Sequence, residues 1–156
     1  MPVKTKLKEE DIARIAEIEA SLFKEKAWSL ELIRNELESP ENLVIVVKDD
    51  FSEIVGYIII RIILDEAEVL RFGVKKENQG KGIGKRLLMT ALDELRRRGI
   101  KKIFLEVSVD NVKAQKLYEK FEFKKVGERK DYYSLGKSAF IMCKILEEGS
   151  HVKSRD

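Results

Sequence analysis

The sequence is poor in the residues on which several common kinds of site depend. Its 156 residues contain one cysteine, Cys143, and one histidine, His151. A single cysteine excludes a disulfide framework and a cysteine zinc site within one chain, so we expect no metal. Because His151 lies in the polar segment 147–156, a Ser-His-Asp triad in the core is excluded as well. Cys143 lies in an apolar run and is expected to be a core residue.

Long apolar segments and blocks of like charge are also missing. The first residues lack the apolar core of a signal peptide, and Ile54–Leu64 is interrupted by Arg61 and is too short to span a bilayer. The 31 basic and 28 acidic residues are interspersed, with a net charge of +3. We therefore expect a cytoplasmic protein that binds neither nucleic acid nor membrane. Length predicts one domain, which we place over 1–146, with a polar tail over 147–156. We expect a monomer or weak homodimer, although the sequence itself does not reveal the quaternary state.

Hydrophobic periodicity predicts an α/β (α+β) domain, in which a mixed, mostly antiparallel sheet of about seven strands is flanked by about four helices. The expected order is β-α-α-β-β-β-α-β-α-β-β, with a polar connection over 130–133 before the last strand. The expected strands are Val3–Lys6, Leu43–Val47, Ile54–Leu64, Ala67–Val74, Lys102–Val109, Phe123–Arg129 and Ala139–Leu146, and the expected helices are Glu10–Phe23, 30–39, Lys85–Arg98 and a short helix after Asn111.

Several single residues mark the ends or the irregularities of these helices. Ser29 and Asn111 are typical N-caps, and Gly99 stands where a helix-ending glycine belongs. The apolar face of the first helix is interrupted by one polar residue, Glu19.

The stretch Gln79-Gly80-Lys81-Gly82-Ile83-Gly84 comes between a strand and the best-defined helix. Alternating glycines followed by a helix N-terminus are typical of a phosphate-binding loop, because they leave backbone N–H groups open to an anion. The dinucleotide-binding pattern does not match, since it requires glycine at position 85, where the chain has Lys85. The P-loop pattern fails at Gln79 and at Arg86.

The pattern Q-x-x-G-x-G after a strand and before a helix resembles the signature of the GNAT superfamily of acetyl-CoA-dependent N-acetyltransferases. The element order over 1–146 is similar to that family's as well. The resemblance implies the GNAT fold, acetyl-CoA as cofactor, and backbone amides of Gln79, Gly80, Lys81, Gly82, Ile83 and Gly84 around the coenzyme A pyrophosphate. Lys81 and Lys85 would add charge near phosphate, although a solvated lysine is the commoner case.

Further stretches resemble one branch of that superfamily. Leu105–Phe121 resembles the L-E-V-x-x-x-N-x-x-A-x-x-L-Y segment of RimI-like enzymes, which acetylate the N-terminal amine of a ribosomal protein; archaeal relatives acetylate many protein N-termini. Ala27-Trp28-Ser29 and Asp131-Tyr132-Tyr133 resemble two other segments of that branch. Two residues depart from it: Ala27 replaces a proline, and Glu122 replaces the glycine that ends a helix. A left-handed Glu122 would cost roughly 1–2 kcal/mol.

Glu106 is the candidate general base. It lies in the middle of a predicted strand, and burial raises the pKa of a carboxyl group toward the range that a base needs. The alternative is a structural glutamate paired with a nearby lysine or arginine. Tyr118 is the general acid that the resemblance implies for the coenzyme A thiolate, or a core aromatic residue. Asn111 caps a helix, contacts the cofactor, or does both.

The remaining candidates concern the two substrates. Phe72, Gly73 and Val74 are expected to offer backbone groups to the coenzyme's pantetheine arm and thioester, and Gly73 is a candidate β-bulge. Trp28, Tyr132 and Tyr133 are candidates for lining the acceptor groove, with ordinary packing an equal alternative for Trp28. The expected acceptor is a protein or peptide N-terminus. A small-molecule amine such as a polyamine or aminoglycoside, and a non-catalytic acyl-CoA-binding domain, are the alternatives.

Overall fold

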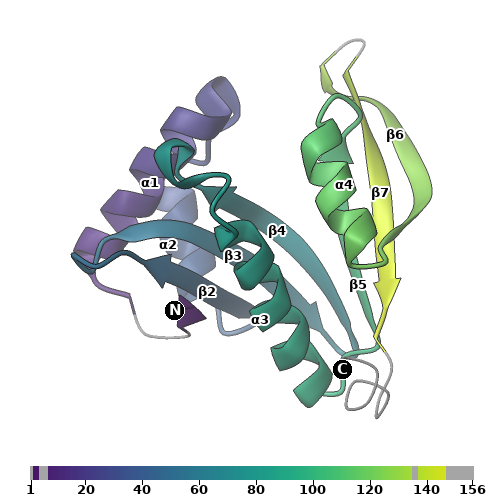
Figure 1. The fold of residues 1–156 in the computed structure, drawn as a ribbon, viewed down its shortest axis with the longest axis horizontal. Helices are drawn as coiled ribbons and strands as arrows, with labels where there is room; N and C mark the ends of the chain where they lie inside the picture. The colour runs from purple at the N-terminus through teal and green to yellow at the C-terminus, as the bar shows by residue number, and fades with distance from the viewer. Residues whose placement is uncertain (1, 4–6, 135–136, 147–156) are drawn as a thin grey trace. The chain divides into compact units, whose positions relative to one another are not determined.

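The computed structural model describes residues 2–3, 7–134 and 137–146, with side chains for 7–130 and 138–146 (Figure 1). The strands form a sheet of order β1-β2-β3-β4-β5-β7-β6. The chain divides into two compact units, Met1–Ile62 with Leu70–Glu94, and Ile63–Val69 with Leu95–Asp156. The elements are β1 (Pro2–Val3), α1 (Glu9–Phe23), η1 (Lys24–Lys26), α2 (Leu30–Glu38), β2 (Asn42–Lys48), β3 (Ile54–Ile63), β4 (Glu66–Val74), η2 (Lys76–Asn78), α3 (Ile83–Arg97), β5 (Lys102–Ser108), α4 (Val112–Lys120), β6 (Lys124–Ser134) and β7 (Lys137–Ile145).

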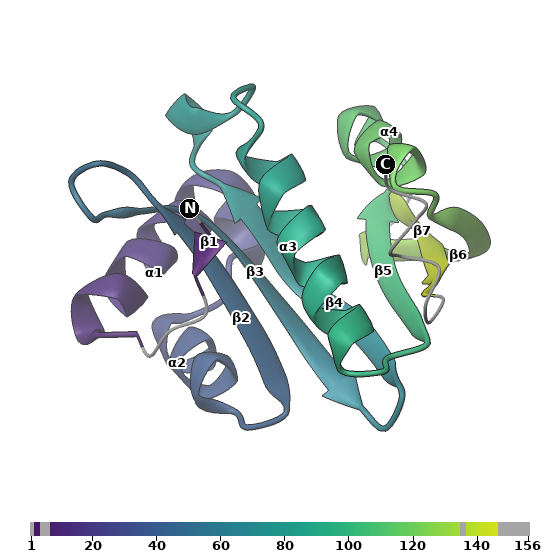
Figure 2. The ribbon, with the colours of Figure 1, turned by 60° about the horizontal axis from the view of Figure 1, so that its bottom comes forward.

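In the first unit, helices cover both faces of the strands (Figure 2). Side chains from α1, α2, β2 and β3 form one core cluster, which includes Ile15, Ile33 and Tyr57. The preceding residue on β3, Gly56, faces the other way, because a Cβ there would lie 3.0 Å from Ile83 and 3.1 Å from Leu87 of α3. Alternation along β3 thus directs one face toward α1 and the opposite face toward α3.

In the second unit, α4 lies beside the strands β5, β7 and β6 (Figure 1). Strand β7 pairs antiparallel with both β5 and β6 and therefore lies between them. The sequence did not predict this order, because strand order depends on contacts between distant segments. The amide of Gln115 on α4 donates to the carbonyls of Ser108 and Val109, each at 3.0 Å, and fixes the helix against the end of β5.

The helix and strand predictions are confirmed, with three corrections. The segment 130–133, predicted as a connection, belongs to β6, which runs to Ser134 and pairs with Lys137. The first strand begins at Pro2 rather than at Val3, and residues 4–6 of the predicted Val3–Lys6 fall outside the described residues. Cys143 is partly exposed rather than core, because an apolar run does not reveal which face of a strand is covered. Among the described residues, no helix is long and apolar enough to cross a membrane.

The helices α3 and α4 end in the same way but with different residues. After α3, the Ile100 amide donates to the Leu95 carbonyl at 3.0 Å and Gly99 has a φ of 78°. After α4, the Phe123 amide donates to the Tyr118 carbonyl at 3.0 Å, and Glu122 has a φ of 70°. Both are Schellman motifs, in which glycine is the unstrained residue at the left-handed position. Glu122 therefore holds a conformation that costs an L-residue energy.

Replacing Glu122 with glycine should stabilise the protein by about 1 kcal/mol, because glycine adopts a positive φ without strain. The measurement is the free energy of unfolding from urea denaturation. Glu122→Ala is the matched control, because both variants lose the 3.6 Å ion pair with Lys144 and only alanine keeps the Cβ. A glycine variant no more stable than the alanine variant would contradict the prediction.

Candidate active site

The glycine-rich loop has the backbone conformation that a phosphate-binding loop needs. Gly80 and Gly82 have φ values of 82° and 83°. A Cβ built on either residue would meet no atom within 4 Å. The glycines are therefore required by conformation rather than by crowding, and the open space beside them leaves this stretch of backbone accessible to a ligand. Helix α3 begins at Ile83, and its Arg86 amide donates to the Gly82 carbonyl at 3.0 Å.

The side chain of Gln79 holds this loop to the end of β4. Its amide donates to the Val74 carbonyl at 3.0 Å. Lys75, which follows Val74, donates its backbone amide to the carbonyl of Val55 on β3 at 2.8 Å. The loop is thus attached to the sheet at its start, and at its end it continues into α3. Gln79 has a structural role whether or not its backbone contacts a ligand.

Gly73 is explained by a close approach within the core. A Cβ at this position would lie 2.8 Å from the hydroxyl oxygen of Tyr57 and 2.9 Å from the adjacent ring carbon. Any side chain at residue 73 would therefore displace Tyr57. The predicted bulge at Gly73 stays a prediction, and the structure gives this second reason for the glycine.

Tyr57 belongs to a buried polar network centred on Glu19, whose side chain is 1% exposed. The Glu19 carboxylate accepts hydrogen bonds from the Tyr57 hydroxyl at 2.7 Å and from the Trp28 backbone amide at 2.9 Å. Arg71 of β4 donates to it from Nε at 3.0 Å and from Nη2 at 2.9 Å. Every oxygen of this buried carboxylate thus has partners, as burial of a charge requires.

In the sequence, Glu19 stands out only as a polar interruption in an apolar helix face. A carboxylate on an apolar helix face is buried only when it is paired and hydrogen-bonded. The position of Glu19 therefore indicates a buried partner. It could not identify Arg71, which is 52 residues away along the chain. The network lies entirely within the first unit.

Glu106 lies in the middle of β5 with its side chain 19% exposed, and its Oε2 is 2.7 Å from Nε of Arg129. Both alternatives drawn from the sequence remain open, because an ion-paired carboxylate can be structural and can also act as a base. Arg129, 55% exposed, is a partner that the sequence did not single out.

The two other candidates of the second unit lie on α4 or at its start. Tyr118 is buried, 7% exposed, and its ring centroid is 5.7 Å from that of Phe123. Asn111 is the N-cap of α4, and its Oδ1 accepts from the Ala114 amide at 3.1 Å. The capping role of Asn111 is confirmed, whereas its contact with the cofactor stays a prediction.

The candidate residues fall into two groups by unit. Trp28, Phe72–Val74 and the loop 79–84 belong to the first unit, and Glu106, Asn111 and Tyr118 to the second. Trp28 is partly buried against the core cluster. Lys81 and Lys85 are exposed. The side chains of Tyr132 and Tyr133 fall outside the described residues.

The acetyltransferase (GNAT) family pattern matches residues 10–123 of this chain. The chain belongs to this family. It is 38% identical over 138 residues to the N-alpha-acetyltransferase RimI of Mycobacterium tuberculosis, covering 85% of each chain. The solved structure of the ribosomal-protein-S18-alanine N-acetyltransferase from Escherichia coli matches with a TM-score of 0.86 and 25% identity, over 97% of this chain and 98% of that one.

An aminoglycoside 6'-N-acetyltransferase solved with coenzyme A has the same fold, with a TM-score of 0.83 at 16% identity, over 94% and 97% of the chains. The protein is thus a GNAT N-acetyltransferase that uses acetyl-CoA. The open, left-handed glycine loop before α3 fits the phosphates of that coenzyme.

Burial, and then the neighbouring Glu19 charge, raise the pKa of the Tyr57 hydroxyl well above its ordinary value. The folded protein therefore keeps a proton that the unfolded chain releases above about pH 10, so stability falls as pH rises through this range. The Tyr57→Phe variant should be less stable near neutral pH, because Glu19 loses a donor.

The same variant should lose stability less steeply than the wild type between about pH 9 and 11, by up to about 1.4 kcal/mol per pH unit. Urea denaturation of both proteins across that range measures the two slopes. Parallel pH profiles would show that Tyr57 does not contribute to alkaline unfolding.

Proposed function

We propose that this acetyltransferase transfers an acetyl group from acetyl-CoA to the N-terminal α-amine of a protein, with the N-terminal alanine of ribosomal protein S18 as its acceptor. The observation that carries the proposal is similarity over 85% of the chain to an enzyme named as an N-alpha-acetyltransferase, and over 97% of the chain to one named as a ribosomal-protein-S18-alanine N-acetyltransferase. The aminoglycoside enzyme shares the fold at a much lower identity, and therefore says nothing about the acceptor. An acceptor of this kind is made in the cytoplasm, where we place the enzyme.

In this proposal, the first unit binds the donor. The backbone amides of the loop 79–84 and the N-terminus of α3 hold the pyrophosphate of acetyl-CoA. Backbone groups of Phe72–Val74 hold the pantetheine arm and stabilise the charge that develops on the thioester oxygen. Gln79 contributes by fixing the loop to Val74, since its side chain donates to that carbonyl.

The reaction forms one C–N bond and breaks one C–S bond. The neutral α-amine attacks the thioester carbonyl, and Glu106 accepts the proton that the amine loses. The departing thiolate takes a proton from the hydroxyl of Tyr118. Trp28, Tyr132 and Tyr133 line the acceptor side.

Glu106→Gln should lower the turnover number on the order of 10²–10⁴-fold at saturating acetyl-CoA, because the amide cannot accept the proton. Arg129→Gln is the matched variant, since it breaks the same 2.7 Å ion pair and leaves the carboxylate in place. A general base predicts a large loss only in Glu106→Gln. Equal losses in the two variants would instead assign Glu106 a structural role, and wild-type turnover in Glu106→Gln would exclude it as the base.

Tyr118→Phe tests the proposed acid. The ring should keep its packing against Phe123, 5.7 Å away between centroids, so folding should be preserved while single-turnover transfer slows. Near-ultraviolet circular dichroism checks the packing. A wild-type transfer rate in this variant would overturn the acid role.

The acceptor is tested with peptides that share one sequence except for their first residue, beside a polyamine and an aminoglycoside. Intact-mass spectrometry should find a single added acetyl group, with the S18 N-terminal peptide that begins with alanine acetylated fastest. Acetylation of the small amines alone would overturn the peptide acceptor. Tight acetyl-CoA binding with no transfer to any amine would instead indicate a non-catalytic acyl-CoA-binding protein.

A further inference from the structure

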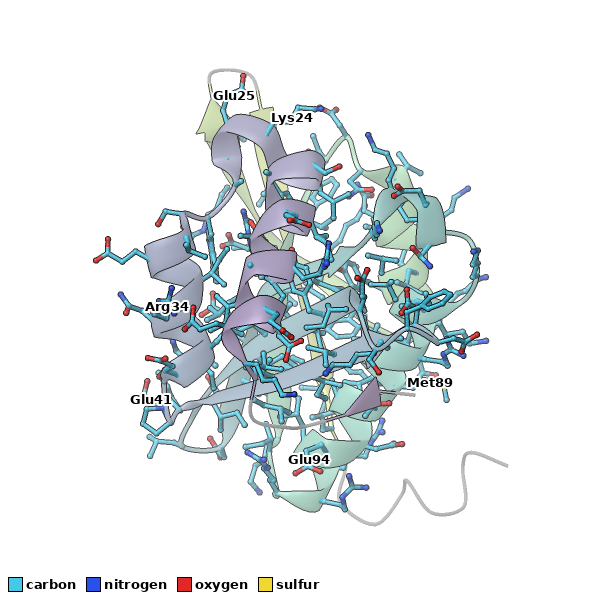
Figure 3. All side chains as sticks on the ribbon, turned by 90° about the vertical axis from the view of Figure 1, so that its left-hand side faces the viewer. Lys24, Glu25, Arg34, Glu41, Met89 and Glu94 are labelled. Carbon is cyan, nitrogen blue, oxygen red and sulfur yellow. The ribbon has the colours of Figure 1, made fainter. Side chains whose placement is uncertain are left out.

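The connection between α1 and α2, residues 24–29, is held by two side chains that lie outside it. Glu19 accepts from the backbone amide of Trp28 at 2.9 Å. Arg71 donates from Nη2 to the carbonyl of Lys26 at 2.7 Å. The connection begins at Lys24 and Glu25, beyond the end of α1 (Figure 3). One backbone donor and one backbone acceptor of this short segment thus depend on a single ion pair.

The guanidinium of Arg71 has further contacts that fix its orientation. Its central carbon lies 4.1 Å from the ring centroid of Phe23 and 5.0 Å from that of Trp28. The same group contacts both oxygens of Glu19. A planar guanidinium can pair with a carboxylate, stack on aromatic rings and donate to a carbonyl at once, whereas an ammonium group cannot reproduce this geometry.

The position of Arg71 relates these contacts to both proposed substrate sites. It directly precedes Phe72–Val74, the strand residues proposed to hold the donor. The connection that it fixes contains Trp28, a candidate for the acceptor side, and is followed on α2 by the exposed apolar residues Leu30 and Leu32, 47% and 37% exposed. One side chain therefore joins the donor strand to a segment proposed to face the acceptor, and all of these residues belong to the first unit.

We propose that Arg71, paired with Glu19, is a positioning residue that sets the conformation of residues 24–29 and through it the affinity for the acceptor. This inference rests on the proposed function, because it assumes that Trp28 faces the acceptor. Phe72–Val74 form the end of β4 within the sheet, so we expect the binding of acetyl-CoA to be independent of the Arg71 side chain.

The Arg71→Lys variant separates the effect of the positive charge from that of the guanidinium geometry. It keeps the positive charge beside Glu19 but loses the bidentate pairing and the stacking. The KM for the S18 peptide should rise on the order of tenfold, as expected when a binding segment loses its fixed geometry, while the KM for acetyl-CoA stays as in the wild type. Arg61→Lys is the matched control, because Arg61 pairs with Glu36 at 3.4 Å in the same unit and does not contact the connection. An acceptor KM no higher than that of the control, or equal rises for both substrates, would overturn the proposal.

Trp28 supplies a readout that does not depend on activity, because it is the only tryptophan in the chain. Arg71→Lys should shift its emission maximum to longer wavelength and increase its quenching by acrylamide, whereas Arg61→Lys should do neither. If Arg71→Lys does not fold, Glu19→Gln replaces it in both measurements, since the amide cannot pair with the guanidinium as a carboxylate does. Unchanged Trp28 fluorescence in a folded variant overturns the proposal. Failure of the wild type to acetylate any peptide would overturn the proposed function instead, and fluorescence would then decide alone whether Arg71 holds the connection.

Discussion

Charge burial at Glu19 is the constraint on which the first unit depends. A carboxylate with a 1% exposed side chain is tolerated only when its oxygens are fully hydrogen-bonded. Glu19 meets this requirement with groups from β3, β4 and the connection between α1 and α2, so these segments must all be placed correctly at once. Loss of one partner of a buried ion pair typically costs about 3–5 kcal/mol. That cost reflects the unpaired charge that is left behind. In the intact pair, the desolvation of both charges offsets much of their attraction, so the network serves geometry more than it serves net stability.

The parts of the fold that follow from local chemistry could be predicted from the sequence. The apolar face of α3, the Ser29 and Asn111 caps, and the left-handed Gly99 are each determined by residues within one or two turns. The place of β7 between β5 and β6 could not be predicted, because strand order arises from pairing between distant segments. Residues 130–133 were misassigned because their polar composition is typical of a connection, although they extend β6.

In the candidate site, too, local features could be predicted from the sequence and distant contacts could not. The glycine loop is a contiguous motif, and its positive φ values at Gly80 and Gly82 confirm what alternating glycines predicted. The partners of Glu19 and Glu106 were not predictable, because Arg71 and Arg129 are two among 31 basic residues and nothing local selects them. Gly73 shows an intermediate case: the sequence marked it as unusual, and only the packing of Tyr57 explains it.

The span of the Glu19 network along the chain also has a consequence for folding kinetics. The hydrogen bonds that end α3 and α4 join residues at most five positions apart and can form as soon as the helices do. The Glu19 bonds to Tyr57 and Arg71 join residues 38 and 52 positions apart, so the chain must close long loops before it gains from them. Interactions that are absent from the transition state slow unfolding without accelerating folding. We therefore expect the buried pair to form late in folding, and to prolong the lifetime of the folded unit rather than to guide the chain toward it.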